Sequence, residues 1–336
     1  MRIAITGGAG FLGVSLARRI LQAGSLAAGG AEPAPVDELL LVDLFPPPAD
    51  LADDPRVSAL VGNVDDSADA LGEVDVIFHL AGVVSGAAEA DFDLGMRTNV
   101  DGFRAILEHA RSLPTPPVLV FTSSLAVFGA DPAIGPQETV DDDTLPRPQT
   151  SYGIQKYIGE QLVADYTRRG FVRGRSVRLI TVAVRPGKAN AAASSFMSSI
   201  IREPLAGVRA VCPVPPDTPF AISSPARTLD GILLAATASD ETWGSTTAVT
   251  LPALTTTPRE MAEALERVAG PETVALIDWV EDPTIRAIVD TWPARVITAR
   301  ATSLGLEPEP DFESVLAQYL ADHPPARGGA APSPLV

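Results

Sequence analysis

Three glycines between an apolar strand pattern and an amphipathic helix pattern constrain the fold of this chain more than any other feature. Gly7, Gly10 and Gly13 directly follow the apolar run Ile3–Thr6. Glycine lets the backbone turn tightly and approach a pyrophosphate closely, and the free N–H groups at the start of the next helix attract the anion. The order of strand, glycines and helix therefore predicts a dinucleotide-binding site. The alternative is that these glycines only form a turn.

The first half of the chain alternates short apolar runs with helical patterns. The expected strands are Ile3–Thr6, Leu39–Val42, Val57–Val61, Val74–Leu80, Val118–Phe121 and Val177–Val182, and helical patterns follow Gly10 and cover 92–112 and 152–169. Such alternation is typical of a parallel sheet covered on both faces. We therefore predict an α/β fold, a Rossmann doubly wound parallel sheet, over residues 1–182.

Beyond residue 182 the strict alternation fades. Helical patterns cover 194–203, 258–268 and 311–322, and strands are expected near 208–212 and 246–251. We predict a smaller C-terminal α/β substrate lobe over 183–323, whose segments can interleave with the main sheet. Two segments are low in complexity: 24–35 is expected to be a surface loop, and 324–336 a disordered tail.

Composition excludes several classes of partner. The net charge of −17 argues against nucleic acid and anionic membranes, so any phosphate site must be built locally. No apolar run is long enough to span a bilayer. A single cysteine, Cys212, rules out an internal disulfide and fits a cytoplasmic protein. The three histidines lack metal-ligand spacing, so no metal site is expected.

Asp43 closes the second predicted strand, where a carboxylate can accept hydrogen bonds from both hydroxyls of an adenosine ribose. It would repel a 2′-phosphate, and the following residues, 44–46, offer no arginine to hold one. The sequence therefore predicts NAD as the cofactor. A solvated turn aspartate is the alternative.

Tyr152 and Lys156 stand four residues apart in a helical pattern, so they share one face. A nearby cation favours phenolate and lowers the pKa of a tyrosine, which makes Tyr152 a candidate general base. Ser123 and Ser124 follow the strand 118–121, at the sheet edge where ligands of doubly wound folds bind. A hydroxyl there can hold a substrate oxygen, although a serine in such a place can also be only a structural cap.

Together these residues resemble the extended short-chain dehydrogenase/reductase family, which includes the NAD-dependent epimerases and dehydratases. The matching segments are Thr6–Gly13, His79–Gly82, Asn99–Val100, Thr122–Gly129 and Ser151–Lys156. The resemblance implies that Ser124 polarises the substrate, Tyr152 is the acid/base and Lys156 its activator. It implies these cofactor contacts: Gly7, Gly10, Phe11, Leu12, Gly13, Asp43, Asn63, Val64, Leu80, Ala81, Gly82, Asn99, Tyr152 and Lys156. The chain departs from the family pattern at Asn63, commonly aspartate, and at Phe128, commonly tyrosine.

Positively charged side chains in the C-terminal half indicate what kind of substrate the protein binds. Arg185, Lys188 and Arg227 suit a carboxylate or phosphate; the alternative is that they are solvated surface residues. As a set, 185–195, 212–214 and 223–227 are similar to the branch of the family that oxidises a four-carbon sugar acid, D-erythronate, at C2. This resemblance implies that Tyr152 deprotonates the C2 hydroxyl while hydride passes to NAD. The implied substrate contacts are Ser85, Ser124, Tyr152, Arg185, Lys188, Asn190 and Arg227.

Two other functions stay open. A nucleotide-sugar 4-epimerase with tightly bound NAD shares the whole N-terminal set of residues, and a scaffold protein could bind the dinucleotide without chemistry. The absence of an acidic pair after Ser124 argues against a dehydratase. The expected partners are therefore a small-molecule sugar acid and a second copy of this chain, since the family often dimerises through helices such as 92–112 and 152–169.

Overall fold

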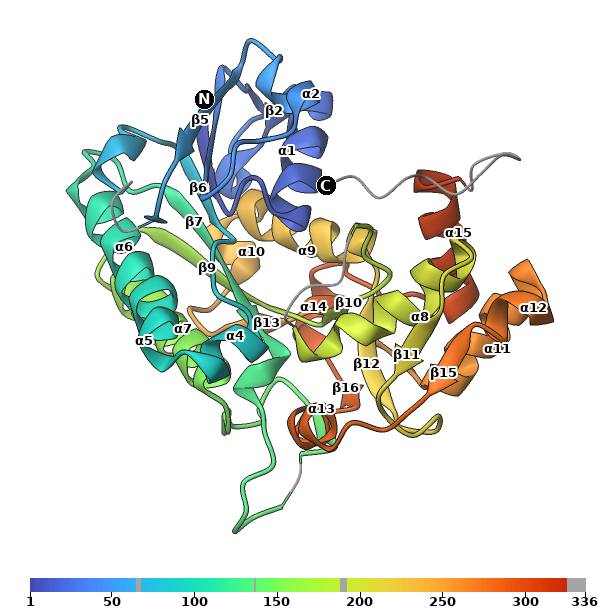
Figure 1. Ribbon diagram of the computed structural model, residues 1–336. Helices are drawn as coiled ribbons and strands as arrows, with labels where there is room; N and C mark the ends of the chain where they lie inside the picture. The colour runs from blue at the N-terminus through green and yellow to red at the C-terminus, as the bar shows by residue number, and fades with distance from the viewer. Residues whose placement is uncertain (65–67, 136, 188–191, 325–336) are drawn as a thin grey trace.

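A computed structural model describes residues 1–64, 68–135, 137–187 and 192–324 (Figure 1). Across these residues the main sheet has seven strands, all parallel, in the order β13-β9-β7-β6-β1-β4-β5. Their bounds are β1 Arg2–Thr6, β4 Glu38–Asp43, β5 Val57–Val61, β6 Val76–His79, β7 Val118–Ser124, β9 Arg173–Leu179 and β13 Val249–Thr250. The predicted doubly wound parallel sheet is confirmed.

The central strands β1, β4, β6 and β7 are buried on both faces, because most of their residues are apolar. On one face Ile3, Ile5 and their neighbours pack against α1 (Phe11–Ala23) and α9 (Pro225–Thr237). On the other face Ala4, Ile77 and Leu119 pack against α6 (Phe103–Ser112) and α7 (Ser151–Arg168). Figure 1 shows these helices on opposite sides of the sheet.

The sixth predicted strand, Val177–Val182, is corrected by the structure. β9 begins earlier, at Arg173, and ends at Leu179, and the next two residues form β10 (Thr181–Val182) in a different sheet. Ile180, which lies between the two strands, is itself buried, so burial continues through this change. The chain therefore changes sheet within 177–182 at a point that no sequence pattern marks.

The helical patterns expected over 92–112 and 152–169, which carry predicted site residues, are both observed. The first, expected over 92–112, consists of α5 (Phe92–Gly95), a π-helical segment η3 (Met96–Gly102) and α6. The second is α7, which begins after Thr150, whose hydroxyl accepts a hydrogen bond from the backbone N–H of Gly153. Asn99 lies within the π-helical segment, and such segments are frequent at functional sites.

The C-terminal half builds a lobe around its own apolar cluster, which includes Met197, Ile201, Ile222 and Leu265. Its strands are β10, β11 (Ala210–Cys212), β12 (Phe220–Ser223), β14 (Leu254–Thr256) and β15 (Ile277–Trp279), and its helices are α8 (Phe196–Leu205), α11 (Pro258–Ala269), α12 (Pro271–Val274), α13 (Pro283–Val289) and α15 (Phe312–Asp322). α9 and β13 come from the same half of the chain but pack on and extend the main sheet. The division at residue 182 stays a prediction.

Short elements connect these layers. They are η1 (Ala28–Gly30), α2 (Ala49–Ala52), η2 (Asp69–Leu71), α4 (Ser85–Ala90), η4 (Leu125–Val127), η5 (Ala193–Ser195), α10 (Asp240–Trp243) and α14 (Ala299–Ser303). Strands β8 (Thr139–Val140) and β16 (Arg295–Val296) pair in parallel and join the segment after the carboxyl end of β7 to the C-terminal half. No helix in the described ranges is long and apolar enough to cross a membrane.

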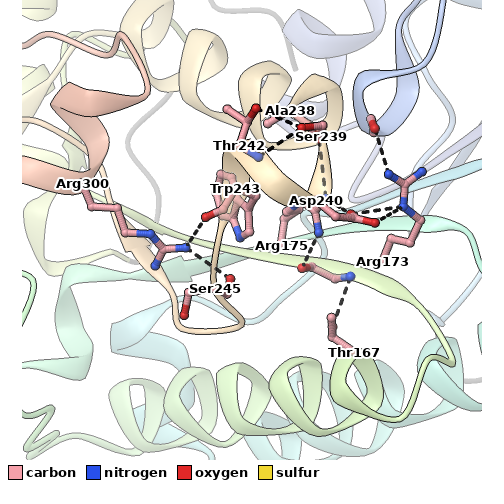
Figure 2. Close-up of polar contacts among 12 residues, drawn as sticks. Thr167, Arg173, Arg175, Ala238, Ser239, Asp240, Thr242, Trp243, Ser245 and Arg300 are labelled. Atoms are coloured by element: carbon pink, nitrogen blue, oxygen red, sulfur yellow. Dashed lines mark hydrogen bonds and ion pairs between the residues drawn. The ribbon is translucent and has the colours of Figure 1, made fainter.

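The segment 24–35, expected to be a surface loop, forms a small hairpin that docks on the rest of the protein. β2 (Ser25–Leu26) pairs with β3 (Ala34–Pro35), and the side chain of Leu26 is buried. Arg173 donates a hydrogen bond to the carbonyl oxygen of Gly29 (2.8 Å) and also contacts Asp240 (Figure 2). The predicted tail, 324–336, lies outside the described residues except for its first.

Candidate active site

A cavity of about 290 Å³ runs from the glycine loop to the C-terminal lobe. Predicted site residues that line it are Gly7, Gly10, Phe11, Leu12, Gly13, Leu80, Gly82, Ser85, Ser124, Tyr152, Lys156 and Arg185. The sheet positions most of them because β1, β6, β7 and β9 all end at the same edge. The structure thus brings the predicted cofactor loop, the proton-transfer residues and one candidate substrate cation into one cavity.

The glycine loop has the geometry that a pyrophosphate requires. Gly7 has φ +72°, a left-handed conformation that favours glycine, and a Cβ on Gly13 would lie 2.1 Å from the carbonyl oxygen of Gly7. The first turn of α1 begins at exposed Gly10, which has no side chain to cap it. Its N–H groups are therefore left for an anion, which compensates locally for the acidic charge of the protein.

Asp43 lies beside this loop at the end of β4. Its carboxylate accepts hydrogen bonds from the backbone N–H of Ala9 (3.0 Å) and of Phe45 (3.2 Å). These two bonds hold the carboxylate in place while the side chain stays partly exposed. Its remaining acceptor capacity is therefore available to ribose hydroxyls.

Ser124, Tyr152 and Lys156 meet where β7 ends against the first turns of α7. Lys156 is buried, and its Nζ donates to the carbonyl oxygen of Thr122 (2.9 Å) and lies 5.7 Å from the centre of the Tyr152 ring. The Ser124 hydroxyl accepts from the N–H of Ala126 (3.1 Å) and also bonds to Tyr152. Ser124 is therefore both the cap of η4 and a partner of the phenol, so the two interpretations of this serine are compatible.

The pKa shift expected for Tyr152 runs in the opposite direction in the structure. Burial raises the pKa of Tyr152 to about 12, and the hydrogen bond to Ser124 only partly opposes the rise. Burial also lowers the pKa of Lys156 to about 8. The sequence argument considered the attraction between phenolate and ammonium but not the cost of burying either charge.

Two buried hydrogen-bond networks hold the residues around this trio. Asn99 accepts from the N–H of Val83 (2.8 Å) and donates to the carbonyl oxygen of Val83 and to Gln155 (2.7 Å), which ties the loop after β6 to α7. Thr6 bonds to His79 (2.8 Å), whose pKa is lowered to about 3 by burial and by the charge of Lys156. His79 is therefore a neutral structural residue.

A buried ion pair joins α7 to the sheet. Glu160, which follows Lys156 by four residues on α7, accepts two hydrogen bonds from Arg178 of β9, each 2.8 Å long. Glu160 also accepts from the hydroxyl of Ser123 (2.6 Å). Ser123 is thus turned toward this pair, which leaves Ser124 as the serine that faces Tyr152. Sequence reasoning missed the pair because Glu160 and Arg178 belong to different elements.

Arg185 is the candidate substrate cation that the cavity contains. Burial, together with the charge of Arg202, lowers the pKa of Arg185. Its backbone is fixed by Ser198, which accepts from its N–H (3.0 Å), and by Arg202, which donates to its carbonyl oxygen (2.8 Å). Among the described residues no carboxylate pairs with its guanidinium. A half-buried cation without a counter-ion suits an anionic ligand.

The other predicted residues lie elsewhere. Arg227 is outside the cavity lining, near the start of α9, 3.9 Å from Asp230. Asn63 is exposed after β5, and the side chain of Val64 is buried in the core. Ala81 donates its N–H to Thr6 (3.3 Å). Lys188 and Asn190 lie outside the described residues.

Sequence reasoning also missed several residues that line the cavity, since it assigned them no role in the site. Thr181, Ala192, Ser194 and Trp292 line the cavity from the C-terminal half, and Val84 and Ala126 line it from the N-terminal half. Trp292 is remote in sequence from every other site residue. The one sequence feature that could have pointed to Trp292 is the rarity of tryptophan, with three in 336 residues.

Comparison with known proteins agrees with this geometry. The NAD dependent epimerase/dehydratase family matches residues 3–216, and the chain belongs to it. A D-erythronate dehydrogenase of Cupriavidus necator is 47% identical over 96% of this chain and 98% of its own length, and a D-erythronate dehydrogenase of Haemophilus influenzae is 39% identical over 95% and 99%. A crystal structure titled nucleoside-diphosphate-sugar epimerase, from Agrobacterium tumefaciens, is 40% identical, has a TM-score of 0.88 and covers 96% of this chain and 94% of its own.

The chain is accordingly an oxidoreductase that uses a nicotinamide cofactor. The residues present fit such a group: the glycine backbone would receive the pyrophosphate, Asp43 the ribose, and Lys156 and Tyr152 lie at the far end of the same cavity. When bound, the oxidised cofactor supplies the acceptor for a hydride. The protein itself supplies the base, the hydrogen-bond donors and the shape of the cavity.

Proposed function

We propose that this chain oxidises D-erythronate at C2 to 2-keto-D-erythronate with NAD. The observation that carries the proposal is that Ser124, Tyr152 and Arg185 line one cavity, where no carboxylate among the described residues pairs with Arg185. Arg185 would hold the carboxylate, Ser124 the C2 oxygen, and Tyr152 would take the hydroxyl proton as the C2 hydrogen leaves as hydride. The names of the two relatives at 47% and 39% identity support this substrate.

A nucleotide-sugar 4-epimerase is the second candidate, favoured by the name of the Agrobacterium structure. The relatives argue against it, because the two D-erythronate dehydrogenases match this chain at 47% and 39% identity over 98% and 99% of their own lengths.

The test is an absorbance assay at 340 nm with NAD⁺ and a panel of four- and five-carbon aldonates. We expect NADH to form with D-erythronate. Tyr152→Phe should bind NAD⁺ normally and lose at least about 100-fold in kcat, because only the acid/base is removed. Absence of reduction across the panel would favour the epimerase, which returns its hydride to the substrate and shows no net reduction.

The preference for NAD over NADP rests on Asp43. We expect kcat/KM with NADP⁺ to be at least about 100-fold below that with NAD⁺, since the carboxylate and a 2′-phosphate would repel each other. Asp43→Asn should reduce the difference in kcat/KM between the two cofactors. It weakens the binding of NAD⁺ and removes the repulsion between the carboxylate and the 2′-phosphate of NADP⁺. Equal use of both cofactors by the unmodified protein would overturn this assignment.

We also propose that the chain works as a homodimer in the cytoplasm. Exposed apolar side chains on α5 and α7, Phe92 (61% exposed) and Ile154 (46%), support a contact between copies there. The single buried cysteine suits a reducing compartment. Light scattering after size exclusion measures the first point, where a mass near 35.0 kDa would contradict the dimer, and cell fractionation measures the second.

A further inference from the structure

The C-terminal half contributes part of the cavity wall, and among the described residues Trp292 is its one large aromatic side chain. The other residues that the C-terminal half contributes to this wall are smaller or charged: Thr181, Val182, Arg185, Ala192 and Ser194. Trp292 also packs against the apolar cluster of the C-terminal lobe. Its indole is thus supported from behind and forms part of the cavity surface in front.

The backbone around Trp292 is anchored on two sides. Its own N–H donates to the carbonyl oxygen of Val289 at the end of α13 (3.1 Å). Two residues further on, the carbonyl oxygen of Ala294 accepts from Thr255 of β14 (2.8 Å), and its N–H donates to Glu138 (3.0 Å). Strand β16 then pairs with β8, so the segment is fastened both to the C-terminal lobe and to the segment that follows the catalytic serine.

A fixed side chain of this size limits what can extend along the cavity. The chemistry places C2 of the acid at Ser124 and Tyr152, and the carboxylate at Arg185. The part of the acid beyond C2 therefore has to fit within the space that the rest of the wall leaves. We propose that Trp292 is a specificity-determining residue that restricts the carbon chain of the sugar acid to four carbons. This inference rests on the proposed function and adds the residue that selects among sugar acids.

The test compares kcat/KM for four-, five- and six-carbon aldonates with NAD⁺ in three proteins. Trp292→Ala should raise the ratio of the five-carbon to the four-carbon acid at least about tenfold, because one added or missing carbon unit in a fitted pocket changes kcat/KM by about 10–200-fold. Trp279→Ala is the matched control. Trp279 belongs to the same lobe but is 41% exposed on β15 and is not in the cavity lining, so the ratio should not change.

The outcomes separate the two proposals. If the unmodified protein oxidises D-erythronate and Trp292→Ala leaves the ratio unchanged, the role of Trp292 is refuted and the proposed function stands. If the unmodified protein oxidises no aldonate, both fail. Should Trp292→Ala not fold by circular dichroism, Trp292→Phe replaces it, with a smaller rise expected in the same ratio, and an unchanged ratio in that variant overturns the proposal equally.

Discussion

At the scale of single residues, burial decides the chemistry as much as spacing does. The four-residue spacing correctly predicted that Tyr152 and Lys156 share a helix face and a cavity. It could not predict the raised pKa of Tyr152 or the lowered pKa of Lys156, because both follow from the apolar surroundings that the fold creates. Trp292 was beyond sequence reasoning for a related reason, since only the folded chain brings it to the cavity.

These two pKa values predict a particular pH profile. Below pH 8 Lys156 is charged, and kcat/KM for oxidation should rise about tenfold per pH unit as the phenolate fraction of Tyr152 grows. Between about 8 and 12 the loss of the lysine charge offsets that growth, so the profile should level. In Lys156→Met the rate should be far lower and the break near pH 8 should vanish. If the break near pH 8 persists in this variant, it comes from the titration of a group other than Lys156.

The same lysine carries a cost in stability. Its pKa is lower in the folded protein than its ordinary value of 10.5, so the charged form opposes folding below pH 8, and the cost disappears above about pH 10.5. A shift to about 8 corresponds to about 3 kcal/mol. Lys156→Met should therefore raise the free energy of unfolding at pH 7 by about 1–3 kcal/mol, since loss of the bond to Thr122 offsets part of the gain. Urea denaturation measures this, and a destabilised variant would contradict it.

At the scale of elements, the parallel arrangement and most strand positions followed from the hydrophobic pattern, whereas the change of sheet at Ile180 did not. Periodicity reports burial, and Ile180 is buried although it belongs to neither strand. The pattern likewise located α7 correctly but not what fastens it to the sheet. That fastening is the pair of Glu160 and Arg178, whose side chains are 3% and 8% exposed.

Removing the charge of Glu160 should show that the buried pair contributes more to the free energy of unfolding than a surface ion pair does. Glu160→Gln leaves the Arg178 guanidinium buried without a counter-charge, so we expect a loss of about 3–5 kcal/mol in the free energy of unfolding. Asp278→Asn is the control. Asp278 pairs with Arg209, but their side chains are 37% and 59% exposed, so the free energy of unfolding should hardly change. Equal losses in the two variants would show that the buried pair has no special role.

At the scale of the whole molecule, segments far apart in the chain are locked together around Asp240. It pairs with both Arg173 and Arg175, and Arg300 reaches the carbonyl oxygens of Trp243 and Ser245 nearby (Figure 2). The hairpin 24–35 docks here as well. Its composition predicted a loop because small residues bury little surface, but those same residues permit the close approach.

Two glycines of this hairpin region test the docking. Gly24 and Gly30 both have positive φ, +69° and +79°, so alanine is strained at either. A Cβ at Gly24 would meet nothing within 4 Å, whereas one at Gly30 would lie 2.6 Å from the Cβ of Ser239. Gly30→Ala should therefore cost about 1–3 kcal/mol more than Gly24→Ala, measured by thermal or urea unfolding. Similar costs would mean that the hairpin is not held against α10 in solution.

Because β13 lies late in the sequence, the main sheet can be completed only late in translation. This strand borders β9 at the end of the main sheet, yet about 70 residues separate the two, and α9, which covers the same region, is also translated in that interval. During synthesis the nascent sheet therefore carries an open strand edge and a bare apolar face until about three quarters of the chain has been translated. Such an edge invites pairing with other chains. A fragment that stops at residue 182 keeps this edge permanently, so residues 1–182 are poorly suited to be expressed alone.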